Sequence, residues 1–160
     1  MLFRSLDETY PGVEELLDQV DHLVVSRDFP SRLMEEPNLE KALKQMQRRY
    51  DCTLTAATLG HEGVLAWDGK QLHYSAAYSV PVVDTTGAGD IFHAGFIYGL
   101  LQDWPLDRQL DFACAAAALN CMAAGARGGI QTLEAIEALM ASGARHHAAY
   151  FVSSTERVAR

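Results

Sequence analysis

Apolar positions recur along this chain in two patterns. Short apolar runs are typical of strands, and the longer segments between them repeat apolar residues every three to four positions, as helices do. The pattern predicts strands over residues 22–26, 53–59 and 80–83, a hairpin around Asp68-Gly69, and helices over residues 13–20, 38–49, 88–102, 106–124 and 133–140. Asn38 is the expected N-cap of the second helix. Alternating strands and helices predict an α/β fold with a mostly parallel sheet and a ligand site at the carboxyl ends of its strands.

The composition is that of a compact globular domain. The chain has 160 residues, of which 49% are hydrophobic and 21% charged, so residues 1–160 are predicted to form one domain. The formal net charge of −8 argues against nucleic acid or an anionic membrane as the main partner. The apolar stretches are too interrupted to predict a membrane span, and the acidic Asp7 and Glu8 do not fit a secretory signal.

The three cysteines, Cys52, Cys114 and Cys121, cannot all pair with one another. Cys114 and Cys121 lie seven residues apart on an alanine-rich predicted helix, where a thiol is most simply a small core side chain. Cysteines used in this way predict a reduced, cytoplasmic protein.

The segment Asp84-Thr85-Thr86-Gly87-Ala88-Gly89-Asp90 places a glycine-rich turn and a carboxylate at the start of a predicted apolar helix. Unpaired N–H groups in the first helical turn favour an anion, and glycines at 87 and 89 lack the Cβ atoms that would keep a phosphate away. Asp90 lies in the same turn, where it can accept a proton from a hydroxyl held beside it. The segment therefore indicates phosphoryl transfer. It is not a Walker A loop, since no Lys-Ser or Lys-Thr follows the glycines, nor a dinucleotide fingerprint, since Phe92 replaces the third glycine.

Together with the following Ile91-Phe92-His93-Ala94-Gly95-Phe96, this segment resembles the C-terminal signature of the ribokinase family, also called the phosphofructokinase-B family of carbohydrate kinases. The resemblance implies a ribokinase-like three-layer sandwich that transfers a phosphoryl group from ATP, bound with Mg²⁺, to a sugar hydroxyl. It implies that Asp90 is the catalytic base. It also implies an anion hole formed by the backbone amides of Gly87, Ala88 and Gly89.

Two further segments resemble nucleotide-binding elements of that family. The first, residues 58–63, resembles the family's Thr-Leu-Gly-x-x-Gly element. This resemblance implies nucleotide contacts at Thr58, Gly60 and Gly63. Taken alone, two glycines three apart can equally be a sharp turn between two strands. The second is the alanine-rich helix that ends at Asn120, which resembles the helix that lines the adenine. Asn120 is therefore either a nucleotide contact or a helix-surface amide.

Metal ligands are less well marked. Many family members have an Asn-x-x-Glu motif that helps to organise magnesium, and this chain has Ser26-Arg27-Asp28-Phe29 in its place. That segment is closer to a Ser-Lys-Asp variant of ketohexokinase-like members, which suggests a fructose-type sugar. Asp84 and Thr86 could offer backbone carbonyls to a cation such as potassium, as in ribokinases, or Asp84 could only brace the anion loop. His93, one turn after Asp90, could touch substrate, tune the base or be structural.

The resemblance covers this whole chain but only the C-terminal half of a complete family member. Nothing before Leu54 resembles the sugar-binding motif and lid of the N-terminal half. We therefore expect a truncated or split kinase, whose partners are ATP, a small sugar, and a second copy of the chain or a missing N-terminal half. The alternatives are a non-catalytic nucleotide-binding or structural remnant, and a kinase of the same fold that acts on a nucleoside or a vitamin-like alcohol.

Overall fold

The computed structural model describes residues 11–147 of the chain, and these residues form two compact units. The first unit contains residues 11–59 and Val64–Tyr74, and the second contains Gly60–Gly63 and residues 75–147. The grouping of residues 1–160 into one domain stays a prediction. Within the described range, no helix is long and apolar enough to cross a membrane.

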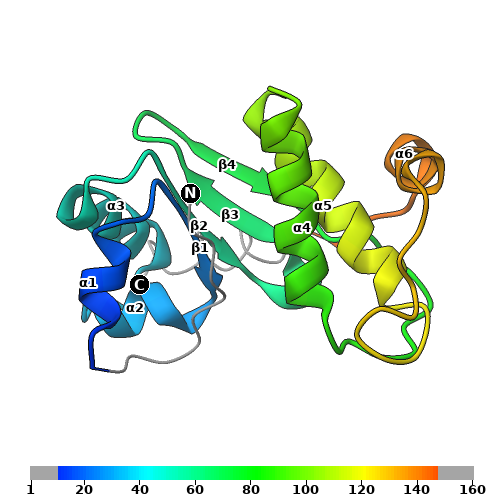
Figure 1. The fold of residues 1–160 in the computed structure, drawn as a ribbon, viewed down its shortest axis with the longest axis horizontal. Helices are drawn as coiled ribbons and strands as arrows, with labels where there is room; N and C mark the ends of the chain where they lie inside the picture. Colours follow the sequence, from blue (N-terminus) through cyan, green and yellow to red (C-terminus); the bar gives the residue numbers. More distant parts are fainter. Residues whose placement is uncertain (1–10, 148–160) are drawn as a thin grey trace. The chain divides into compact units, whose positions relative to one another are not determined.

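A four-stranded sheet with the order β1-β2-β3-β4 runs through the first unit (Figure 1). Its strands are β1 (His22–Ser26), β2 (Leu54–Thr58), β3 (Val64–Trp67) and β4 (Leu72–Ser75). β1 and β2 are parallel, with Ser26 opposite Thr58, whereas β2 and β3 are antiparallel. The prediction of a mostly parallel sheet is therefore wrong. The reason is the short connection between β2 and β3, a 3-10 turn η1 (Gly60–Glu62), because parallel neighbours need a crossover of about a dozen residues.

The predicted hairpin is confirmed and is formed by β3 and β4. Asp68 closes it, because its Oδ1 accepts hydrogen bonds of 2.7 Å from the N–H groups of both Lys70 and Gln71. The Nε2 atom of His73 lies 3.1 Å from the other carboxylate oxygen. Hydrogen bonds from Gln71, Lys70 and His73 lower the pKa of Asp68 to about 2.

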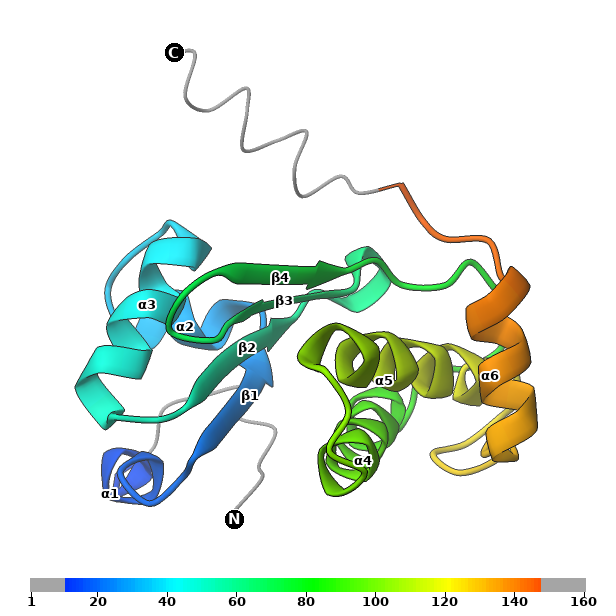
Figure 2. The same ribbon diagram turned by 90° about the horizontal axis from the view of Figure 1, so that it is seen from above.

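Three helices accompany this sheet, α1 (Val13–Leu17), α2 (Asp28–Leu33) and α3 (Leu39–Tyr50). α2 and α3 lie on the same face of the sheet (Figure 2). Asn38 is the N-cap of α3, as predicted, and its Oδ1 accepts a hydrogen bond of 3.0 Å from the N–H of Lys41. One hydrophobic cluster joins the helices to β1, and its buried members are Val13, Leu17, Val20, Leu23, Val25, Phe29, Met46, Tyr50 and Cys52.

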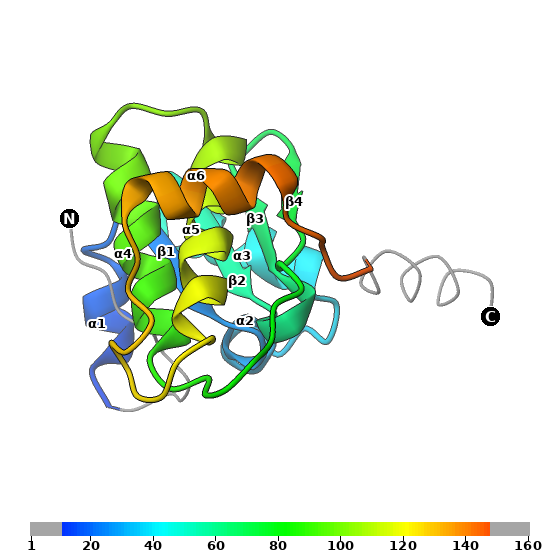
Figure 3. The same cartoon turned by 90° about the vertical axis from the view of Figure 1, so that its right-hand side faces the viewer.

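The second unit is helical, and its helices are α4 (Ala88–Leu101), α5 (Leu106–Asn120) and α6 (Leu133–Ser142). A Cβ added to Gly95 of α4 would lie 3.0 Å from the Cα of Ala113, and one added to Gly99 would lie 3.1 Å from the Cγ of Gln109. The glycines thus let α4 and α5 approach closely. Since later residues of α4 meet earlier residues of α5, the two helices are antiparallel. α6 lies across α5 (Figure 3).

The predicted strand over residues 80–83 is wrong, because these residues form no regular structure. Pro81 has no N–H to donate to a sheet, and the side chains of Val82 and Val83 are 59% and 65% exposed. The N–H groups of Val83 and Asp84 instead donate to the carbonyl of Cys121, at 2.8 and 3.2 Å. This contact follows the last residue of α5, which ends at residue 120 rather than at the predicted 124.

Candidate functional site

The loop before α4 requires glycine at one position and is open at another. Gly87 is the N-cap of α4 and has a φ of 77°, in the left-handed region. A Cβ added there would lie 2.5 Å from the carbonyl oxygen of Ala126, so glycine is needed for conformation and for space. Gly89, in the first turn of α4, has no neighbouring atom within 4 Å of an added Cβ. The space above Gly89 is therefore free for a ligand.

Two backbone N–H groups of this loop, those of Gly87 and Gly89, have no acceptor within residues 11–147. The N–H of Ala88 donates to the carbonyl of Thr85 at 3.1 Å, and the N–H of Ile91 donates to the carbonyl of Gly87 at 2.9 Å. Two of the three amides predicted for the anion hole are thus available in this conformation. They lie at the positive end of the α4 dipole, where an anion is favoured.

Asp90 lies in the same first turn of α4, and its side chain is exposed. One turn later, the buried His93 places its Nδ1 2.7 Å from the carbonyl oxygen of Gly89. Since a carbonyl oxygen can only accept, Nδ1 must carry the proton in this contact. The loop thus combines unpaired N–H donors with an accessible carboxylate, which are the groups needed to hold a phosphate and to receive a proton. A substrate contact of His93 stays a prediction.

Asp84 braces the loop. Its Oδ1 accepts a hydrogen bond of 2.9 Å from the N–H of Thr86, and its Oδ2 accepts one of 2.8 Å from the N–H of Gly125. Both hydrogen bonds stabilise the charged form of Asp84 and so hold its pKa below the ordinary value. The bond from Thr86 has the larger effect. The carboxylate therefore joins the anion loop to the glycine-rich segment that follows α5. Gly125 is not among the predicted site residues, although this segment is visible in the sequence.

Asn120 supports the same loop from the end of α5. Its side chain is completely buried, and its Nδ2 donates a hydrogen bond of 3.3 Å to the carbonyl of Thr86. Its Oδ1 is also buried and has no hydrogen-bond partner among the residues that the structure describes. Asn120 is thus a core residue rather than a helix-surface amide, and its contact with a nucleotide stays a prediction.

The other residues predicted to bind the nucleotide are divided between the two units. Thr58 ends β2 in the first unit, where its Oγ1 donates to the carbonyl of Val25 at 3.3 Å. Gly60 and Gly63 belong to the second unit and have φ angles of 62° and 105°. A Cβ on Gly63 would lie 2.0 Å from the carbonyl oxygen of Ser75. Gly63 is thus required by the fold itself, and the nucleotide contacts of all three residues stay predictions.

The predicted cation ligands are the backbone carbonyls of Asp84 and Thr86, and the carbonyl of Thr86 already accepts a hydrogen bond from Asn120. Both carboxylate oxygens of Asp84 accept N–H groups of the backbone. No cluster of three or more His, Cys, Asp or Glu side chains that could hold a metal ion occurs in the described part of the chain. The geometry shows Asp84 as a brace, and a potassium site at Asp84 and Thr86 stays a prediction.

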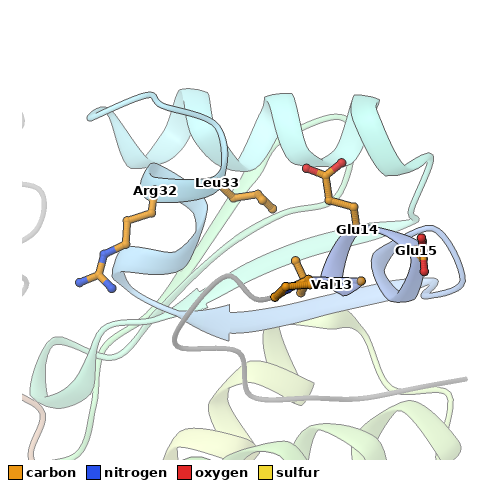
Figure 4. Close-up of a pocket in the computed structure, with 7 residues that line it drawn as sticks. Val13, Glu14, Glu15, Arg32 and Leu33 are labelled. Carbon is orange, nitrogen blue, oxygen red and sulfur yellow. The ribbon is translucent and has the colours of Figure 1, made fainter.

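A cavity of about 590 Å³ lies in the first unit, beside α1 and α2 (Figure 4). It is lined by Pro11, Gly12, Val13, Glu14, Glu15, Arg32 and Leu33. Two of its charged residues are paired within the unit, Glu14 with Arg49 at 2.7 Å and Arg32 with Asp28 at 3.7 Å. None of the predicted site residues lines this cavity, so it gives no support to the predicted chemistry.

Comparison with known proteins assigns the family. The model of the pfkB family carbohydrate kinases matches residues 3–133. The chain belongs to this family. A ribokinase of Lactococcus lactis subsp. lactis is 36% identical over 124 residues, which are 78% of this chain and 40% of the relative. The pfkB assignment agrees with the signature that contains Gly87, Gly89 and Asp90.

Solved structures show that the fold is ribokinase-like. Arabidopsis thaliana ribokinase complexed with ribose and ATP matches with a TM-score of 0.72 and 27% identity, over 79% of this chain and 42% of that one. A putative ribokinase II from E. coli in complex with ATP and Mg²⁺ matches with a TM-score of 0.75 and 23% identity, over 81% and 42%. The α/β class is thus confirmed. The chain spans less than half the length of these relatives.

Proposed function

We propose that this chain is the catalytic-loop part of an ATP-dependent kinase that phosphorylates a sugar hydroxyl. The observation that supports the proposal most directly is the start of α4, where two unpaired N–H groups share one helical turn with an exposed carboxylate. Phosphoryl transfer needs little covalent chemistry from the protein, and depends on positioning and on charge stabilisation. Membership of the pfkB family supports a carbohydrate as the acceptor.

Each group has a defined role in this proposal. Asp90 accepts the proton of the sugar hydroxyl as its oxygen forms a bond to the γ-phosphorus of ATP, and ADP leaves with the electrons of the broken P–O bond. The N–H groups of Gly87 and Gly89 stabilise the negative charge of the transferred group. Magnesium would be supplied with ATP and would neutralise charge on its phosphates. No cluster of three or more His, Cys, Asp or Glu side chains occurs among the described residues.

The nucleotide contacts and the acceptor are proposed from sequence resemblance. Thr58, Gly60, Gly63 and Asn120 are proposed to line the nucleotide, by resemblance to the family's motifs. The segment Ser26-Arg27-Asp28 supports a fructose-type sugar, whereas the Arabidopsis relative was solved with ribose. We also propose potassium dependence through Asp84 and Thr86, and self-association of the chain.

The substitution Asp90→Asn tests the catalytic role. It keeps the size of the side chain and removes its basicity, so sugar-dependent ADP release by a form of the protein with kinase activity, alone or complemented by an N-terminal half, should fall about 100- to 10,000-fold. The affinity for ADP should change little, because the substitution leaves the backbone amides in place. Asp107→Asn is a matched control, since Asp107 is an exposed aspartate in the first turn of α5. That variant should keep the turnover of the unmodified protein.

Coupled assays of ADP release with ribose and with hexoses, and calorimetric titrations with ADP, give both quantities. Unchanged turnover in the Asp90→Asn variant would exclude Asp90 as the base. If the protein binds ADP but forms no ADP from ATP with any sugar, the result would favour the alternative, a nucleotide-binding module without transfer activity. Turnover with a nucleoside or a vitamin-like alcohol, and none with the sugars, would show that the acceptor is of that class instead.

A further inference from the structure

We propose that Asn120 is a positioning residue that sets the direction of the Gly87 N–H group toward a bound phosphoryl group. The inference rests on the proposed function, because the group to be bound is the phosphate that Gly87 and Gly89 would hold. It differs from a nucleotide contact of Asn120, because the side chain acts through the backbone of the anion loop.

Side chains hold both backbone polar groups of Thr86. Asp84 accepts its N–H at 2.9 Å, and Asn120 donates to its carbonyl at 3.3 Å. The peptide bond between Thr86 and Gly87 is planar and trans, so its C=O and N–H point in opposite directions. Because Asn120 is buried, the hydrogen bond draws the Thr86 carbonyl toward the interior. The N–H of Gly87 must then point the other way, away from Asn120.

Without this hydrogen bond, the peptide plane would be free to rotate. Residue 87 is a glycine with a φ of 77°, and glycine tolerates alternative backbone angles better than any other residue. A rotated plane would turn the Gly87 N–H away from the anion and present a carbonyl oxygen there instead. A carbonyl repels a phosphate, so the direction of this one peptide decides whether the loop attracts or rejects its ligand.

Asn120 is enclosed on both its side chain and its backbone. The side chain is completely buried, and the segment after α5 packs against the backbone. A Cβ added to Gly129 would lie 2.5 Å from the carbonyl oxygen of Asn120. The Oδ1 atom of Asn120 is buried without a partner among the described residues, which costs free energy that an apolar side chain of similar size would avoid. The hydrogen bond from Nδ2 of Asn120 to the carbonyl of Thr86 explains why an amide, rather than an apolar side chain, occupies this position.

The test compares two buried amides on the same helix. Gln109 lies near the opposite end of α5, is 7% exposed, and donates from Nε2 to the carbonyl of Trp104 at 2.7 Å. Asn120→Leu and Gln109→Leu each replace a buried amide by an apolar side chain and remove one hydrogen bond to a backbone carbonyl. Only the first bond belongs to the anion loop.

The first measurement follows the amide resonances of Gly87 and Gly89 in the ¹⁵N-labelled protein during titration with inorganic pyrophosphate. Both resonances should shift in the unmodified protein and in Gln109→Leu. In Asn120→Leu, the shift of Gly87 should be lost and the affinity should fall about tenfold or more, because one of two donors is misdirected. If Asn120→Leu does not fold, Asn120→Ala replaces it, since it leaves a small cavity rather than a larger apolar group.

The second measurement is steady-state kinetics on the same proteins. Loss of an oriented donor should lower kcat by about 10- to 100-fold in Asn120→Leu and leave the KM for the sugar within about twofold. Gln109→Leu should leave both constants unchanged. A large loss of adenosine affinity in Asn120→Leu, with the pyrophosphate shift of Gly87 preserved, would overturn the positioning role in favour of direct nucleotide contact alone.

The two proposals fail in different ways. If pyrophosphate shifts neither glycine in the unmodified protein, the anion site itself is refuted, and the positioning role with it. If pyrophosphate shifts both glycines equally in the unmodified protein and in the Asn120 variant, only the positioning role is refuted. An equal loss of kcat in Asn120→Leu and Gln109→Leu would also refute it, because both effects would then come from general destabilisation.

Discussion

Replacing Gly89 by Ala should make the protein more stable and at the same time less able to bind phosphate. Gly89 lies in the first turn of α4, has no positive φ, and has no neighbour within 4 Å of an added Cβ. Alanine is favoured over glycine within a helix by about 0.5–1 kcal/mol, because the unfolded chain loses less freedom. At about 2–4 °C per kcal/mol for a chain of this size, Tm should rise by about 1–4 °C.

The added methyl group would occupy the open space above the helix start, where the proposed phosphate approaches the Gly89 N–H. We therefore expect weaker ADP binding in the Gly89→Ala variant despite its higher stability. Gly87→Ala is the matched comparison, since it changes the neighbouring glycine of the same loop. Its Cβ would meet the Ala126 carbonyl oxygen at 2.5 Å, and its φ of 77° is unfavourable for alanine. The left-handed conformation costs about 1–2 kcal/mol and the overlap about 1–3 kcal/mol, so stability should fall by about 2–5 kcal/mol.

Urea unfolding and calorimetric titration with ADP measure the two quantities on each variant. Opposite changes in stability, together with weaker ADP binding in both variants, would support a phosphate site above Gly89. The reasoning would be refuted by a Gly89→Ala protein that binds ADP as tightly as the unmodified protein, because no phosphate could then use that space. A Gly89→Ala protein that is clearly destabilised would show that the space is not free.

Two further predictions concern groups outside the loop. Burial raises the pKa of the Cys114 thiol to about 12 and that of Cys52 to about 11, and it also raises that of Cys121. A thiol-reactive disulfide reagent at pH 8 should therefore find no reactive cysteine in the folded protein and three after denaturation, and a fast-reacting thiol in the native state would contradict the buried placement. The lowered pKa of Asp68, about 2 against an ordinary 3.8, means that its charged form stabilises the fold above pH 4 and that this contribution is lost as the pH falls toward 2. Urea unfolding from pH 5 to pH 2 should show a smaller loss of stability in Asp68→Asn than in the unmodified protein, and equal losses would contradict the role of its hydrogen bonds.

Local patterns were sufficient where neighbouring residues decide the structure. The strand at residues 22–26 was predictable from its apolar run, and the start of α3 from the side chain of Asn38, whose hydrogen bond spans three residues. The hairpin followed from Asp68 and Gly69, because the carboxylate of Asp68 closes the turn by accepting the N–H groups of Lys70 and Gln71, two and three residues later. The glycines and Asp90 of the anion loop were predictable for the same reason, since the chemistry of a helix start is local.

Contacts between distant segments explain what the sequence could not predict. Residues 80–83 have the composition of a strand, but the N–H groups of Val83 and Asp84 bond to Cys121 instead of a neighbouring strand. The same contact coincides with the end of α5, which alanine-rich sequence alone would extend. The bond between Asp84 and Gly125 joins residues 41 positions apart, and no local signal indicates it. The six-residue α2 is also too short for periodicity to reveal.

The antiparallel packing of α4 and α5 determines how far the electric field of the anion site extends. The start of α4, with its partial positive charge, lies beside the end of α5, with its partial negative charge, because Asn120 bonds directly to Thr86. At distances beyond the helix spacing of about 8–10 Å, these two opposite partial charges largely cancel. A phosphate bound at the proposed site would therefore not be guided from afar by the helix dipole, and would gain its attraction only on contact with the N–H groups themselves. Selection at the proposed site would then depend on shape and contact, and nucleotide association should depend little on the screening of the α4 dipole by salt.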